Sequence, residues 1–159
     1  EMNRALIATL VAGLASAASA AAAQDINGVA RVIDGGTIGI GAQTIRLTGL
    51  AAPEPGQRCE RSGQSYDCGQ EAAWALAERL GRHWVLCVET GREPAEMIEA
   101  ICYLGGRQGI DVNAHMVRQG WAVAAPGGAT YADAEAAARR ERLGMWAGSF
   151  THPTQFRSR

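Results

Sequence analysis

The sequence contains no lysine, so all 15 of its basic residues are arginines. They are matched by 16 acidic residues, which leaves a formal net charge of -1. A nearly neutral chain lacks the positive excess with which proteins coat nucleic acids without specificity, although a local basic groove is compatible with this balance. The absence of lysine is typical of a GC-rich genome. It also means that every cation here can form a forked contact with a phosphate or a carboxylate.

The sequence also lacks an apolar run long enough to cross a bilayer. Its first residues instead have the pattern of a secretory signal peptide, with Arg4 before the short apolar stretch 5–14 and small residues up to Ala23. We therefore expect a signal peptide over residues 1–23 and one domain over 24–159, secreted or periplasmic and not membrane-bound once processed. A transmembrane anchor is the alternative, which the weak hydrophobicity of alanine disfavours.

Four cysteines are compatible with an exported chain, and they allow three disulfide pairings. We favour Cys59–Cys68, which would close a polar loop, and Cys87–Cys102, which would face each other across a hairpin. A zinc site is the competing interpretation. Neither pair has the short spacing of a zinc knuckle, so the sequence favours disulfides.

The pattern of apolar residues and turn residues predicts five strands and three helices. The strands are expected over 27–33, 37–40, 43–50, 83–89 and 97–104. The helices are expected over 69–80, from Asp111 to Gly120, and over 131–143, while 53–67 is expected to be a loop. This order indicates an α+β fold in which a five-stranded OB-type β-barrel is packed against three helices.

Several short motifs occur in a characteristic order along the chain. They are Arg31-Val32-Ile33-Asp34-Gly35 with Thr37, Ile45-Arg46-Leu47, Pro53-Glu54, Cys68-Gly69-Gln70-Glu71-Ala72, Asp111-Val112-Asn113, Met116-Val117-Arg118-Gln119-Gly120-Trp121-Ala122, Tyr131 opening a helix to Ala138-Arg139, Gly144-Met145-Trp146 and Pro153. In this order they resemble the staphylococcal nuclease (thermonuclease) family, from about Gly28 to Arg157. The resemblance implies a secreted nuclease that uses calcium to hydrolyse DNA and RNA.

The resemblance also implies which side chains would do the chemistry. The first arginine that clamps the phosphate falls on Arg46, and the glutamate that activates water falls on Glu54. The first aspartate of the family's Asp-Gly-Asp-Thr motif falls on Asp34, which is a weak candidate for a metal ligand. Calcium prefers hard oxygen ligands, and two guanidiniums suit a transition state with spread negative charge.

This sequence departs from the family at four of these positions. The two aspartates expected to bind calcium fall on Gly36 and Ala51, and the threonine that lends its backbone carbonyl falls on Ala52. The second clamping arginine falls on Met97, with Arg92 and Arg107 as the nearest substitutes. No cofactor is therefore predicted for this chain, although the resemblance implies calcium for the family.

Three functions remain open from the sequence. The first is a nuclease-like pseudoenzyme that is non-hydrolytic or very weak, binding a phosphate, nucleotide or nucleic acid. The second is an active metal-dependent nuclease, and the third is a structural or partner-binding module of the cell envelope. In structural terms Arg46 and Glu54 could be a plain ion pair, Asp34 could be a turn-former, and the four tryptophans could be packing anchors. We expect a monomer.

Overall fold

A computed structural model describes residues 24–94, 96–126 and 129–157 of the chain. The expected signal peptide lies outside these residues. Within the described part, no helix is long and apolar enough to span a membrane.

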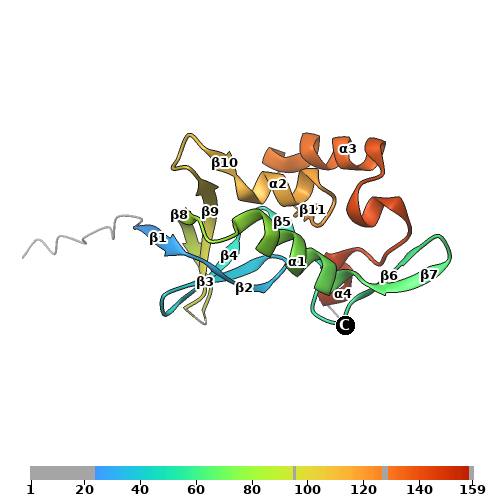
Figure 1. The fold of residues 1–159 in the computed structure, drawn as a ribbon, viewed down its shortest axis with the longest axis horizontal. Coiled ribbons are helices and arrows are strands. Elements are labelled where there is room, and N and C mark those ends of the chain that lie inside the picture. The colour runs from blue at the N-terminus through green and yellow to red at the C-terminus, as the bar shows by residue number, and fades with distance from the viewer. Residues whose placement is uncertain (1–23, 95, 127–128, 158–159) are drawn as a thin grey trace, which may run out of the picture.

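The chain forms a curled β-sheet with helices packed beside it (Figure 1). The strands are β1 Asp25–Val29, β2 Arg31–Asp34, β3 Thr37–Ile40, β4 Gln43–Leu47, β5 Leu50–Ala51, β6 Arg58–Arg61, β7 Gln64–Asp67, β8 Trp84–Arg92, β9 Ile98–Leu104, β10 Ile110–Asp111 and β11 Val123–Ala124. The helices are α1 Cys68–Leu80, α2 Val112–Arg118, α3 Ala132–Glu141 and α4 Pro153–Arg157, with 3-10 turns at Ala129–Tyr131 and Gly144–Ala147.

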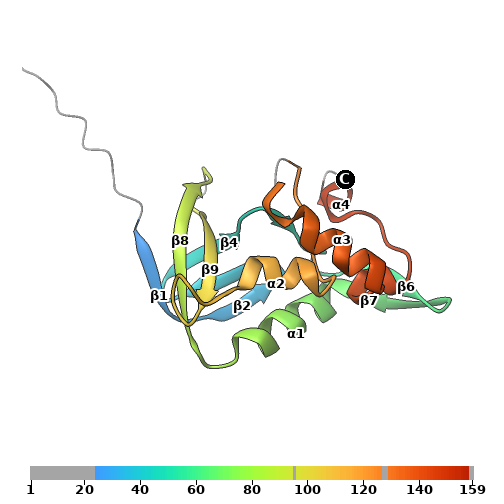
Figure 2. The same cartoon turned by 90° about the horizontal axis from the view of Figure 1, so that it is seen from above.

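The main sheet runs in the order β1-β8-β9-β4-β3-β2, and β10 pairs with β9. All its pairings are antiparallel except that of β4 with β9, which is parallel. The sheet forms a half-barrel at one end of the molecule, while the β6–β7 hairpin lies at the opposite end in both views (Figures 1 and 2). This architecture is consistent with the predicted α+β fold of OB type.

The sheet and helices enclose a core, toward which alternate residues of β1 and β9 point, while β3 is buried along its whole length. Ile38 and Ile45 are fully buried, and Val85 and Ile98 are no more than 2% exposed. Full burial of such a side chain stabilises the fold by about 1.5–3 kcal/mol. Asp67 and Asp111 cap the first turns of α1 and α2, each accepting a bond of 2.8 Å from the backbone N–H three residues on.

A buried amide joins the helices to the sheet. Asn113 on α2 is fully buried, and its side-chain oxygen accepts a bond of 3.1 Å from the Cys102 N–H. Its amide nitrogen donates to the Thr48 and Ala100 carbonyls at 2.9 and 3.1 Å. One side chain thus satisfies three backbone groups where β9 and the end of β4 meet α2.

The structure corrects several sequence-based expectations. The strand expected over 27–33 is two strands, β1 and β2, which pair with β8 and β3. The strand expected over 43–50 ends at Leu47, and the described residues hold a fourth helix, α4, beyond the three expected.

Residues 53–67 are not all loop, because 58–67 folds into the β6–β7 hairpin. The strand expected over 83–89 continues to Arg92. Trp74 and Trp84 are 64% and 69% exposed, so these two tryptophans are not packing anchors.

Candidate functional site

A small cavity of about 10 Å³ brings the two retained family residues together. Its lining comes from the β2–β3 turn, from β4 and from the segment after β4, and consists of Asp34, Gly36, Thr37, Arg46, Leu47, Leu50, Ala52, Pro53 and Glu54. Arg46 lies opposite Thr37 in the β3–β4 pairing. Arg46 and Glu54, which the sequence singled out separately, therefore contribute to one site.

Arg46 forms an ion pair with a carboxylate that the sequence did not single out. Its Nη1 lies 3.1 Å from Oε1 of Glu93, and the two side chains are 29% and 33% exposed. Glu93 follows β8, where its backbone N–H bonds to the Met97 carbonyl at 2.9 Å and closes the turn to β9. The turn thus places the Glu93 carboxylate next to the Arg46 guanidinium, which the family resemblance implies would bind phosphate.

Asp34 acts on its own turn. Its Oδ1 accepts a bond of 2.8 Å from the Gly36 backbone N–H, the geometry by which aspartate stabilises a tight turn. A Cβ placed on Gly36 would lie 3.4 Å from the Ala52 Cβ and 3.5 Å from Leu50 Cδ1, which are ordinary contacts. Position 36 is buried, and it has room for a Cβ within 3.8 Å of the Asp34 carboxylate.

Ala51 and Ala52 belong to different parts of the protein interior. Ala51 pairs with Val123 in the β5–β11 ladder and packs in an apolar cluster with Cys59, Cys68 and Met145. Ala52 lines the cavity and packs in the main core. Of these two family positions, only Ala52 presents its side chain to the cavity.

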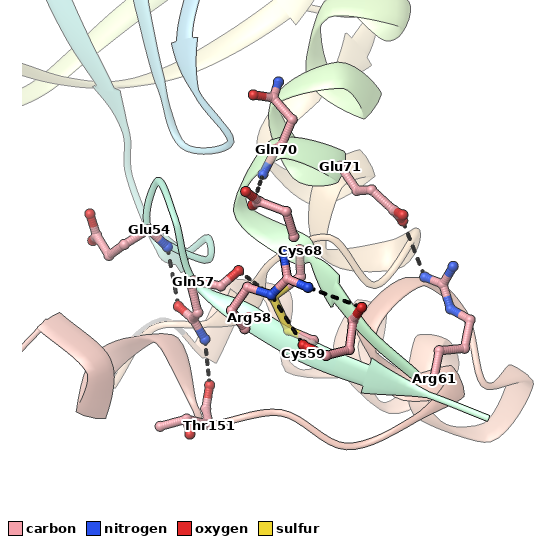
Figure 3. Close-up of a disulfide and its surroundings, with 11 residues drawn as sticks. Glu54, Gln57, Arg58, Cys59, Arg61, Cys68, Gln70, Glu71 and Thr151 are labelled. Atoms are coloured by element: carbon pink, nitrogen blue, oxygen red, sulfur yellow. Dashed lines mark hydrogen bonds and ion pairs between the residues drawn. A yellow bond between two sulfur atoms is a disulfide. The ribbon is translucent and has the colours of Figure 1, made fainter. Parts of the chain in front are cut away.

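Buried contacts fix the backbone at Glu54 (Figure 3). Gln57 is fully buried, and its Oε1 accepts a bond of 3.2 Å from the Glu54 N–H while its Nε2 donates to the Thr151 carbonyl at 2.8 Å. A Cβ on Gly69 would collide with the Glu54 carbonyl. The backbone at the start of α1 can therefore lie this close to the Glu54 backbone only because residue 69 is glycine. Gln57 is a positioning residue that the sequence gave no reason to select.

Both predicted disulfides are confirmed. Cys59–Cys68 joins β6 to the first residue of α1, close to the Glu54 loop, and Cys87–Cys102 links directly opposed residues of β8 and β9. No cysteine is free, so the alternative of a zinc site built on cysteines is excluded.

The predicted substitutes for the second arginine lie in other interactions. Arg92 makes a forked contact with Glu89, with bonds of 2.7 and 3.1 Å. Arg107 bonds to Asp25 at 2.5 Å. Arg92, Arg107 and Met97 do not line the cavity. Among the described residues that line it, Arg46 supplies the guanidinium.

The carboxylates of this cavity do not match the calcium set that the resemblance implies. Calcium takes 6–8 oxygen ligands, usually with several carboxylates. Here the lining carboxylates are Asp34 and Glu54, and Asp34 is engaged with Gly36. Across the described residues, no group of three or more His, Cys, Asp or Glu side chains is placed to hold a metal ion.

Comparison with known proteins decides the family. The family model described as "Staphylococcal nuclease homologue" matches residues 44–148. The chain belongs to this family. It is 33% identical to "Succinoglycan biosynthesis protein ExoI" of Rhizobium meliloti (strain 1021), covering 92% of this chain and 78% of the relative. It is 35% identical to "Micrococcal nuclease" of Shigella flexneri, covering 74% and 71%.

Proposed function

We propose that this member of the staphylococcal nuclease family binds a phosphate-bearing ligand at Arg46 and hydrolyses phosphodiesters very slowly or not at all. The observation that carries the proposal is the composition of the cavity. It combines an arginine and a glutamate from the hydrolytic set with glycine at one position of a metal-binding aspartate, Gly36, while Ala51, at the other such position, packs in an apolar cluster outside the cavity lining. The ligand would be a nucleotide or a nucleic acid, bound weakly by one chain.

The expected loss of rate follows from electrostatics. A phosphodiester transition state gains negative charge, which the family would neutralise with a dication and two guanidiniums. Arg46 alone supplies part of that charge. Removal of one preorganised electrostatic element commonly costs about two to three orders of magnitude in rate. Loss of the metal ligands and of one arginine would leave Glu54 beside an uncompensated phosphate.

Phosphate binding would itself be moderate. A phosphate oxygen must compete with Glu93 for the Arg46 guanidinium, which lies 3.1 Å from that carboxylate. Arginine forms charge-assisted bonds with both carboxylate and phosphate, so we expect this exchange to be nearly balanced and phosphate binding to be strongest at low salt. We expect affinity that falls as salt rises, with a shallow slope because few phosphates are contacted.

Two other functions have specific support. Arg46 and Glu54 line one cavity, and one relative is named a micrococcal nuclease, which favours an active nuclease with a rebuilt metal site. The other relative is named for succinoglycan biosynthesis, so the two names do not indicate one activity. Exposed Trp74 and Trp84 favour the third function, a partner-binding module. The two disulfides support export to an oxidising compartment.

One set of assays separates these functions. The purified protein is incubated with fluorescent single-stranded DNA in calcium, magnesium, manganese or chelator, and binding and cleavage are measured at low salt. We expect binding that Arg46→Gln abolishes and that Glu54→Gln preserves, with no cleavage above background. Metal-dependent cleavage lost in Glu54→Gln would overturn this proposal and establish the nuclease. Absence of any salt-sensitive binding would instead favour the partner-binding module.

A further inference from the structure

A second cavity, of about 360 Å³, lies away from the Arg46 site, between α1 and α2. Its lining consists of Ala75, Glu78, Arg79, His115, Met116, Gln119 and Trp121. The first three residues have the spacing of one face of α1, and His115 on α2 lies one turn before Gln119, which caps the end of that helix. Its volume lies within the range of small-molecule sites, about 300–1,000 Å³.

Arg79 is the residue that points to a ligand. Its Nε is buried, and among the residues that the structure describes it has no hydrogen-bond partner. A buried donor without a partner costs free energy, and arginine presents Nε and one terminal nitrogen as a fork that matches an oxyanion. An anion in the cavity would satisfy this atom.

The other lining residues indicate the charge of the anion and the polarity of the rest of the ligand. Glu78 is exposed at the rim, so one arginine and one peripheral carboxylate face the ligand, which suits a monoanion better than a dianion. Trp121 and Ala75 are partly buried and give the cavity accessible apolar surface, while Met116 is fully buried and packs behind it. This apolar surface suits a ligand with an aromatic or aliphatic body.

We propose that the cavity between α1 and α2 binds a small organic monocarboxylate, with its carboxylate on Arg79 and its apolar body against Trp121 and Ala75. His115 lies on the facing helix and lines the same space. The pKa of His115 is lowered, first by burial and then by the positive charge of Arg79. A bound carboxylate would offset that charge and raise the pKa of His115, so this histidine reports occupancy.

The proposal is tested with phenylacetate as the probe, by NMR titration of the His115 ring resonance, assigned by its absence in His115→Gln. Phenylacetamide keeps the shape of the probe but lacks its charge, acetate lacks its apolar body, and inorganic phosphate supplies a different oxyanion. We expect saturable shifts and a raised His115 pKa with phenylacetate, and much weaker effects with the other three. Arg79→Gln should weaken binding at least about tenfold.

Arg82→Gln provides the matched control, because Arg82 is exposed three residues further on and does not line the cavity. It should bind phenylacetate as the parent protein does, and so should Arg46→Gln, which keeps this test independent of the phosphate site. Arg79→Lys serves if Arg79→Gln fails to fold, and it should retain only part of the affinity. Equal binding of phenylacetamide, tighter binding of phosphate, full binding by Arg79→Gln or Arg79→Lys, or no saturable shift with phenylacetate would each overturn the proposal.

Discussion

Arg46 on β4 and Glu93 in the β8–β9 turn form an ion pair, with 3.1 Å between Nη1 and Oε1. The pair joins the cavity to a turn that is distant in sequence. Arg46 therefore already has a negatively charged partner within the protein, and a phosphate would have to compete with it. The affinity of the site for anions therefore depends on a residue outside the family's catalytic set.

Replacement of Glu93 by glutamine should increase affinity for a short oligonucleotide by about 1.4- to fivefold, because such ion pairs contribute about 0.2–1 kcal/mol. Fluorescence anisotropy at low salt measures this change. Glu96→Gln removes the same charge from an exposed position of the same turn and should change affinity less. An equal gain in both variants would mean that overall turn charge, and not the Arg46 pair, sets the affinity.

Restoration of the two missing aspartates should have unequal costs. Gly36→Asp should lower the free energy of unfolding by about 1–2 kcal/mol, because a Cβ at this buried position meets only ordinary contacts but the new carboxylate would lie near that of Asp34. Ala51→Asp should cost about 2–3 kcal/mol or more, because Ala51 is only 5% exposed and packs in an apolar cluster. Urea denaturation measures both, with Ala42→Asp in an exposed turn as the control. Equal stability of the three variants would contradict the assigned burial of Ala51.

Asn113→Asp should destabilise the protein by about 2–4 kcal/mol. An ionised aspartate has no amide hydrogens to donate to the Thr48 and Ala100 carbonyls, and it would be a buried charge. Asn27→Asp makes the same chemical change at an exposed position on β1 and should have a small effect. Thermal unfolding followed by circular dichroism compares them, and similar melting temperatures for the two variants would count against the three-bond role of Asn113.

The lowered pKa of His115 predicts a pH dependence of stability. The folded protein takes up fewer protons than the unfolded chain between the folded pKa and the ordinary value of 6.5. Stability should therefore rise with pH in this window and have its full His115 contribution above about pH 6.5. Urea midpoints measured from about pH 5 to about pH 8 should show a smaller slope for His115→Gln than for the parent. His83→Gln, which removes a histidine at an exposed position, is measured alongside as the control.

The sequence predicted the order of most elements because their signals are local. The alternation in β3 and the helical spacing in α1 are properties of neighbouring residues, and both elements lie within one residue of the prediction. The disulfide pairing was also predictable, since a hairpin places Cys87 opposite Cys102. The β6–β7 hairpin was missed because its residues are polar and charged and show no apolar alternation.

The candidate site was predicted only in part for a related reason. Motif order marks Arg46 and Glu54, but contacts between distant segments have no local pattern. Glu93 meets Arg46 only because β8 extends to Arg92 and places the turn near β4. Gln57 resembles any polar loop residue until the fold buries it. The exposure of Trp84 likewise depends on which face of β8 points away from the core, and the local sequence does not determine this.

The bond from Gln57 to Thr151 ends on a backbone carbonyl, 94 residues along the chain. Evolution can therefore change the side chain at position 151 freely while the bond persists, provided that position 57 keeps an amide. Substitutions in the tail would leave the position of the Glu54 backbone unchanged, whereas removal of the tail would remove one of the bonds that hold Gln57 against it. A shortened version of this protein that ended before position 151 would carry an altered site, even though every residue lining the Arg46 cavity was still present.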